Sequence, residues 1–224
     1  MSGVTLTFLD KTYYANKDTT LSFKNGTLWT LLTYNSRSAS DLLNNTADLI
    51  SRIAIYTTHI IFNVLAFDFD EVKKGFGALN KSSRIYSYQL VGKLIGMVPI
   101  IGQIFCITLI KRSKDNSEEK QTAWKTSNEF NRTTPEINTS KRAVYETFMI
   151  PAKLAQYSLF ILQSFNSATS ALILADKDRL KIKDYDCYLP LAAALQIILH
   201  PLGITLKAIK GIFSPINHLL GKAK

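Results

Sequence analysis

Apolar residues follow different patterns in different parts of this chain, and each pattern predicts a different kind of element. Over residues 4–34 they alternate with Thr, Ser and Lys, which is typical of strands. The step Lys24-Asn25-Gly26 supplies residues that accept a positive φ. We therefore expect a small β-hairpin or extended arm over 1–37, which should lie on the rest of the protein because an isolated hairpin is only marginally stable in water. A partly disordered tail is the alternative.

Helical spacing of apolar residues begins at Ser40, with Asp41 in the expected first turn, and continues to about Phe67. The uninterrupted part between Arg52 and Asp68 is about 15 residues long, whereas crossing a bilayer takes about 20. We therefore expect a core helix here.

A break should follow, because the segment 68–83 is first acidic and then basic and contains Gly75 and Gly77. The next apolar run covers 86–110 and carries no charge between Lys93 and Lys111.

Pro99 lies in the middle of this uncharged run, between Gly96 and Gly102. Proline removes a backbone donor and clashes with the preceding turn, so a kink or a tight re-entrant bend is expected. Such a bend would enter a membrane and return; the alternative is a buried helix broken at Pro99. Gly92 and Gly96 are spaced so that another helix could approach closely.

Residues 112–141 are rich in Ser, Asn, Glu, Lys and Thr, which is the composition of a solvated loop or linker. Trp124 and Phe130 are its large apolar side chains, and they could hold part of the loop in place or mark a contact. The chain thus divides into an arm (1–37), a first helical half (38–112), a polar linker (113–140) and a second helical half (141–224).

The second half should begin with a helix over 141–175. Its uncharged part is long enough to span a bilayer, but many polar side chains make it a poor helix for contact with lipid, so a helix in a bundle is expected. A charged turn at 176–186 and an apolar run at 188–206 follow. The end, 206–224, is cationic and amphipathic, as in an interfacial helix; a last helix packed on the core, with extended lysine side chains, is the alternative.

The 27 Lys and Arg residues outnumber the 17 Asp and Glu residues, which gives 224 residues a formal charge of +10 and favours an acidic partner surface. Basic residues lie beside the most hydrophobic stretches, where they would meet anionic lipid headgroups; ordinary solvated helix ends are the alternative. The tyrosines lie mostly within apolar or β-like stretches, so nucleic-acid binding is a minor alternative.

No motif assigns a residue to catalysis, a metal or a nucleotide. Two cysteines, Cys106 and Cys187, lie in or beside apolar runs and suit buried free thiols. Three scattered histidines, His59, His200 and His218, lack the spacing of a metal site and suit packing or surface positions. Neither Gly75 nor Gly92 belongs to a phosphate-binding loop. We therefore expect no enzyme activity, no cofactor and no small-molecule ligand.

Two phrases resemble segments of small hydrophobic-hairpin proteins of Chlamydia-like obligate intracellular bacteria. They are Met97-Val98-Pro99-Ile100-Ile101-Gly102 and the tail from Pro201 to Pro215, and together they cover about a fifth of the chain. The resemblance implies a membrane- or host-associated protein and carries over no catalytic residue.

These observations predict a mainly α protein, a helical bundle with Pro- and Gly-broken apolar helices. The expected function is non-enzymatic membrane association, with possible placement at a membrane or in the cytoplasm, and no cleavable secretory signal is visible. The alternative is a soluble helical-bundle interaction module with an acidic protein partner. The residues expected to contact the membrane or partner are Pro99, Ile100, Ile101, Phe105, Lys207, Lys210, Ile212 and Phe213.

Overall fold

The computed structural model describes residues 5–16, 28–114, 118–128, 142–173, 194–206 and 209, and the regular structure in these segments is helical. This confirms the prediction of a mainly α fold. The helices are α1 (Phe8–Ala15), α3 (Leu28–Leu65), α4 (Phe69–Met97), α5 (Ile101–Lys114), α6 (Glu118–Asn128), α7 (Arg142–Phe148) and α8 (Ile150–Ile173), followed by a helix at 194–206.

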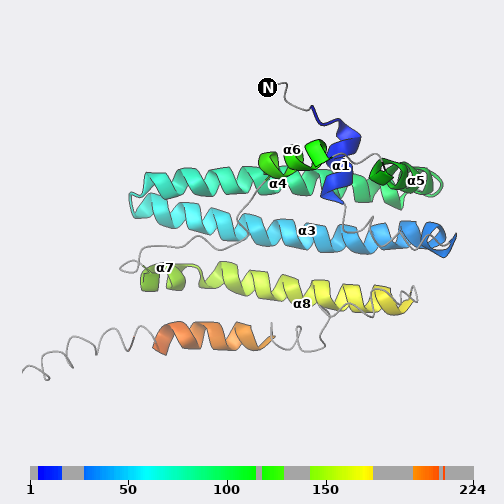
Figure 1. Cartoon of the computed structure of the whole chain (residues 1–224). Coiled ribbons are helices and arrows are strands. Elements are labelled where there is room, and N and C mark those ends of the chain that lie inside the picture. Colours follow the sequence, from blue (N-terminus) through cyan, green and yellow to red (C-terminus); the bar gives the residue numbers. More distant parts are fainter. Residues whose placement is uncertain are drawn as a thin grey trace, which may run out of the picture.

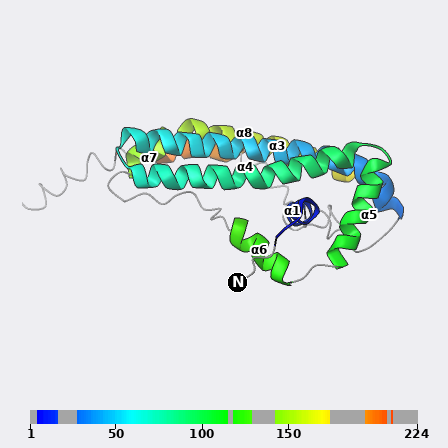
Figure 2. The same cartoon turned by 90° about the horizontal axis from the view of Figure 1, so that it is seen from above.

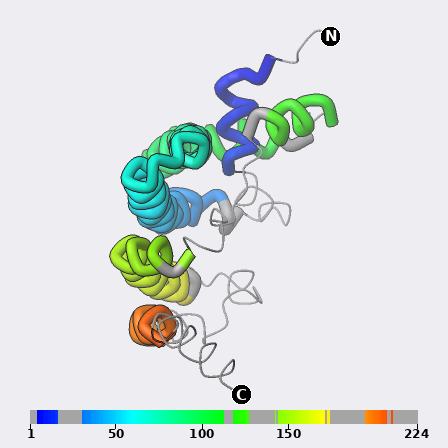
Figure 3. Tube along the Cα trace, turned by 90° about the vertical axis from the view of Figure 1, so that its left-hand side faces the viewer, coloured from blue at the N-terminus to red at the C-terminus, as the bar shows by residue number. Residues whose placement is uncertain are grey.

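Helices α3, α4 and α8 and the helix at 194–206 stack into one elongated layer (Figure 1). The long helices α3 and α4 form an antiparallel hairpin, α8 packs along the other side of α3, and the 194–206 helix lies beyond α8. Figures 2 and 3 show α1 and α6 together on one side of this layer, next to α4, while α5 turns away at the end of α4. The opposite side of the layer carries no further helix among the described residues.

The N-terminal segment is helical where we expected strands. Helix α1 begins with a capping box, in which Thr7 and Asp10 exchange hydrogen bonds between side chain and backbone. Its Tyr13 and Tyr14 pack with Phe105 and Leu109 of α5 in a buried cluster. The strand prediction is therefore wrong for 8–15 and for the first turns of α3, and Lys24-Asn25-Gly26 lies outside the described residues.

Helix α4 runs through the glycines at which we expected a break. A Cβ on Gly75 would lie 2.8 Å from Cγ1 of Ile60 on α3, so this glycine allows the two helices to approach closely. The chain reverses earlier, where Phe67 adopts a φ of 56° and the Asp68 side chain accepts a hydrogen bond from the backbone of Glu71.

The Pro99 bend is present. Helix α4 ends at Met97 and α5 begins at Ile101, so the chain turns over 98–100. The expected close approach at the glycine pair is also confirmed. A Cβ on Gly92 would lie 2.7 Å from Nδ2 of Asn16, the residue that caps the end of α1, and one on Gly96 would collide with Ser38 of α3.

The expected polar linker contains helix α6. Glu118 and Glu119 in its first turn and Lys125 in its last turn suit the helix dipole. Trp124 stacks on Tyr14 of α1, with ring centroids 5.9 Å apart, so this tryptophan does fix the segment against the fold. Phe130 lies outside the described residues.

The second half contains the expected bundle helix as α7 and α8. Tyr145, Met149 and Ala152 pack against Ile55 and Phe62 of α3 in the buried cluster at one end of the layer. No helix in the described segments combines the length and hydropathy that crossing a bilayer requires.

Candidate interaction surface

The described residues show an unusual distribution of polarity. Their buried positions hold 15 hydrophobic and 14 polar or charged residues, whereas 33 large hydrophobic side chains are exposed. A water-soluble domain gains most of its stability from burying apolar area. Here nearly as many polar as hydrophobic residues are buried, so much of the helix packing relies on polar contacts. The exposed apolar side chains form the candidate interaction surface.

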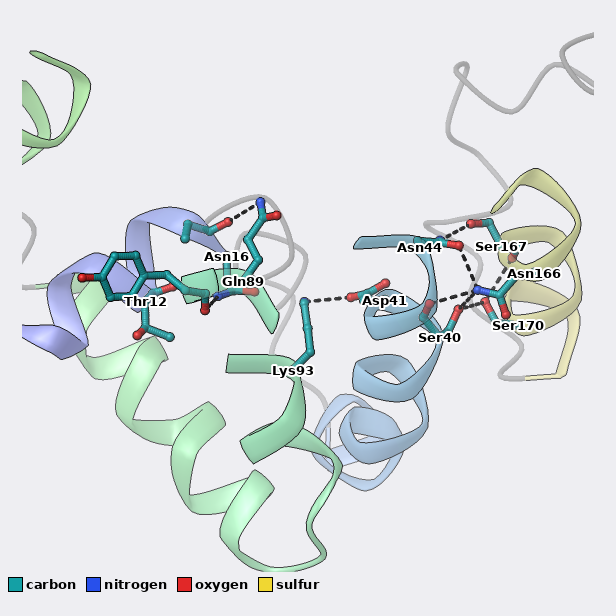
Figure 4. A network of polar contacts seen from close by, with 12 residues as sticks. Thr12, Asn16, Ser40, Asp41, Asn44, Gln89, Lys93, Asn166, Ser167 and Ser170 are labelled. Carbon is teal, nitrogen blue, oxygen red and sulfur yellow. Dashed lines mark hydrogen bonds and ion pairs between the residues drawn. The ribbon is translucent and has the colours of Figure 1, made fainter. Parts of the chain in front are cut away.

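The contact between α3 and α8 contains a polar seam, which we define as Ser40, Asn44, Asp48, Gln163, Asn166, Ser167 and Ser170. Figure 4 shows Ser40, Asn44, Asn166, Ser167 and Ser170 of this seam. The Asn166 amide donates to the Ser40 backbone carbonyl at 2.9 Å, to its hydroxyl at 3.1 Å and to Asn44 Oδ1 at 2.9 Å. Gln163 donates to the Asn44 carbonyl at 2.7 Å and to Asp48 at 3.1 Å. The side-chain amides of Gln163 and Asn166 on α8 thus donate hydrogen bonds to backbone and side-chain acceptors on α3.

The contact between α3 and α4 is also polar and includes a buried ion pair. Lys93 Nζ lies 2.9 Å from Asp41 Oδ2, and only 4% of the lysine side chain is exposed. Tyr86 donates to Asp48 at 2.9 Å and accepts from Arg52 Nε at 2.8 Å. Burial raises the pKa of Tyr86 to about 12, so the phenol stays protonated and remains a donor.

His59 occupies a buried polar junction of α3, α4 and α7. Its Nδ1 lies 3.0 Å from the Tyr145 hydroxyl, Asn63 lies 3.2 Å from either ring nitrogen, and Nε2 is 3.9 Å from Glu71 Oε2. Burial lowers the pKa of His59, although Glu71 and Asp68 oppose the shift. The expected role in packing is confirmed, and no group of three or more potential metal-binding side chains occurs within the described segments.

A third polar cluster holds α1 against α5 and α6. Arg112 Nη2 lies 2.8 Å from Asp10 Oδ1, and Lys120 Nζ lies 3.6 Å from the same oxygen. Burial opposes ionisation of Asp10, but hydrogen bonds from Thr7 and the Arg112 charge prevail and lower its pKa.

The Pro99 turn presents its apolar side chains outward. We call Val98, Pro99, Ile100, Ile101 and Ile104 the isoleucine tip. The three isoleucines are 73%, 56% and 59% exposed, respectively, and Ile100 adopts a φ of 66°. Such a backbone conformation is uncommon for a β-branched residue.

Asn35 of α3 fixes the base of the tip. Its amide donates to the carbonyl oxygens of Gly96 at 2.8 Å and Val98 at 3.1 Å, and its own oxygen accepts from Gln103. Gly102 lies so close to the Gly96 carbonyl that a Cβ would collide with it. The tip is therefore a fixed projection, since both ends of the turn are tied to α3.

The structure places the expected contact residues in three situations. Pro99, Ile100 and Ile101 are exposed together in the tip. Phe105 is only 8% exposed and packs with Tyr13 and Tyr14, so it belongs to the buried contact of α5 with α1 and not to the exposed surface that we expected. The expected tail residues lie outside the described residues: Lys207, Lys210, Ile212 and Phe213.

Sequence reasoning missed the outward apolar side chains of α3 and α8. A signal for them exists, because Leu43, Ile50, Ile61 and Val64 recur at helical spacing. Such a stripe is normally assigned to the core, and only the structure shows that it is exposed.

Cys106 is a free thiol that is completely buried beside Tyr34, as expected. Burial raises its pKa to about 11, which keeps it protonated. Cys187 lies outside the described residues.

No protein-family model matches the chain, and comparison with curated proteins and with solved structures likewise gives no match.

Proposed function

We propose that this chain is a non-enzymatic helical protein that binds an anionic membrane surface through the isoleucine tip. The carrying observation is that three strongly exposed isoleucines project from a turn that Asn35 ties to α3. A fixed apolar projection loses little conformational entropy on insertion, because its backbone is already ordered. The resemblance to hydrophobic-hairpin proteins of Chlamydia-like bacteria supports the same function.

Helix α5 extends the exposed apolar surface of the tip. Ile104 and Ile107 are exposed on one face, and the exposed Lys111 follows at helical spacing on the same face. Phe105 and Leu109 on the other face are buried against α1. With the tip inserted and α5 leading away from the membrane, the isoleucines near the start of α5 would enter the boundary of the acyl chains while Lys111, further along the helix, reaches the headgroups.

Charge supports an anionic surface over a neutral one. The formal charge of +10 attracts the chain to acidic lipid, and Lys111 is exposed on α5, the helix that begins at the tip. An acidic protein partner is the alternative for this charge, but it does not account for the apolar projection of the tip.

Vesicle flotation tests the proposal. The full chain is mixed with vesicles of phosphatidylcholine alone or with phosphatidylglycerol, at low and high salt. We expect flotation with the anionic vesicles that weakens as salt rises, because screening reduces the attraction of lysine to headgroups. A monodisperse protein that stays at the bottom of the gradient under every condition would refute membrane binding and leave the acidic protein partner.

A further inference from the structure

Helix α8 has its polar and apolar sides reversed relative to a helix of a water-soluble bundle. The side that faces α3 carries Gln163, Asn166 and Ser167, all hydrogen-bonded. Away from this seam lie four large side chains that are between 62% and 76% exposed. They form the outer stripe of α8: Leu162, Phe165, Leu172 and Ile173.

Helix α3 repeats this reversal in its first half, before the buried apolar cluster of Ile55 and Phe62. Asp41 and Arg52 face α4, and Ser40 and Asn44 face α8. The remaining side of the helix carries exposed apolar residues. They form the outer stripe of α3: Leu43, Ile50, Ile53, Ile61 and Val64.

Helical geometry places the two outer stripes on the same side of the layer. Helix α8 is antiparallel to α3, since Ser40 pairs with Ser170 and Asp48 with Gln163. Because the two helices are antiparallel and the seam lies between them, both outer stripes face away from α1 and α6. Figure 3 shows no described helix on that side of the layer. From residue 43 to residue 64 the α3 stripe is about 30 Å long at 1.5 Å per residue.

The chemistry of the seam indicates lipid as the occupant of this side. In lipid the hydrophobic effect does not drive helices together, and hydrogen bonds between small or amide side chains contribute to their association. Water would favour the opposite arrangement, with the apolar stripes turned inward.

The apolar surface is also continuous with the proposed membrane contact. Val91, Leu94 and Met97 are exposed near the end of α4 and lead into the isoleucine tip. A lipid surface can cover a long face and an adjoining projection together.

We infer that the outer face of the α3–α8 layer is a second lipid-contact surface, on which the layer lies flat at the boundary between headgroups and acyl chains. This inference rests on the proposed function, because the tip supplies the first contact with the membrane. The occupant is the acyl-chain region of an anionic bilayer, and the contact residues are the two outer stripes.

Environment-sensitive labels can test the second surface separately from the first. In the 224-residue chain carrying Cys187→Ser, with Cys106 protected by burial, a nitrobenzoxadiazole label is attached at Ile50→Cys, Phe165→Cys or Ile104→Cys. Thr122→Cys on the exposed side of α6 is the control, because α6 lies across the layer from the outer stripes. The probe is a vesicle of phosphatidylcholine and phosphatidylglycerol, with or without nitroxide-labelled acyl chains.

We expect a several-fold rise in fluorescence on vesicle addition at positions 50, 165 and 104, quenching by the nitroxide chains, and no change at position 122. A response at position 104 alone would overturn the second surface and leave the proposed function standing. No response at any position would overturn both. Fluorescence that rises at 50 and 165 with protein concentration in the absence of vesicles, with no further response to lipid, would assign the outer face to a second copy of the chain and overturn the inference.

Polar substitution gives a second measurement. Ile50→Ser with Phe165→Ser should weaken vesicle binding about tenfold or more, since each change removes an apolar side chain from lipid. Both side chains are exposed, so helicity measured by circular dichroism should be unchanged. Unchanged vesicle affinity with intact helicity would overturn the inference.

Discussion

Lys93 on α4 and Asp41 on α3 form an ion pair at 2.9 Å in which the lysine side chain is almost completely buried. The pair lies between the Gly96 contact and the Tyr86 network, so it links the two longest described helices near the C-terminal end of α4. Removing one partner would leave the other charge buried without its ion pair.

Single replacements in this pair should therefore be costly. We expect Lys93→Met or Asp41→Asn to lower the free energy of unfolding by about 3–5 kcal/mol, and the double variant to recover part of that loss. Denaturant unfolding of the four proteins measures the coupling. Additive losses in the double variant would show that the two side chains do not depend on each other.

Gly96 and Gly77 on α4 provide a matched comparison. Gly96→Ala should destabilise the fold by about 1–3 kcal/mol, because the added Cβ would collide with Ser38. Gly77 has nothing within 4 Å of its ideal Cβ, so Gly77→Ala should stabilise α4 by about 0.5–1 kcal/mol. Thermal unfolding of both variants checks the opposite signs, and equal shifts would contradict the close helix approach.

His59 should make stability depend on pH. Burial lowers its pKa in the folded state below the usual 6.5, so the unfolded chain binds more protons in the interval below 6.5. Its stabilising contribution is complete above about pH 6.5 and is lost as pH falls through the lowered pKa. Unfolding free energies across this interval should fall for the natural chain and fall less for His59→Gln. Parallel curves would remove His59 as the cause.

Replacing Ile100 by asparagine should raise the stability of the fold and weaken membrane binding. Its φ of 66° is unfavourable for a β-branched residue but tolerated by asparagine. We expect Ile100→Asn to raise the free energy of unfolding by about 0.5–1 kcal/mol, since relief of backbone strain meets no packing loss at a side chain that is 73% exposed. Vesicle affinity should fall in the same variant. Loss of stability would show that the side chain is needed for the turn.

The Pro99 bend and the bundle role of α8 could be predicted because their signals are local. Proline ends a helix through its own covalent structure. The many amides and hydroxyls of α8 are unfavourable toward lipid, which assigned this helix to a bundle, and the structure confirms that assignment by pairing them with α3.

The errors arose where tertiary contacts override local pattern. Alternation around Leu6 and Phe8 suggested a strand, although Thr7 and Asp10 form a capping box that starts α1. Gly75 suggested a break in the helix, although its missing side chain lets Ile60 of α3 pack closely against α4. Which face of α3 would be exposed could not be predicted, because an apolar stripe has the same spacing whether a core or another surface covers it.

Quantitative vesicle binding of an isoleucine-tip variant tests the central claim most directly. Ile101→Ser with Ile104→Ser is compared with Val144→Ser, a change at a side chain that is 66% exposed on α7, at the opposite end of the layer (Figure 1). All three proteins are titrated with vesicles containing phosphatidylglycerol. The account predicts affinity for the natural chain, about tenfold or greater weakening in the tip variant and little change in the control. Equal affinity of the natural chain and the tip variant, or no binding by the natural chain, would contradict it.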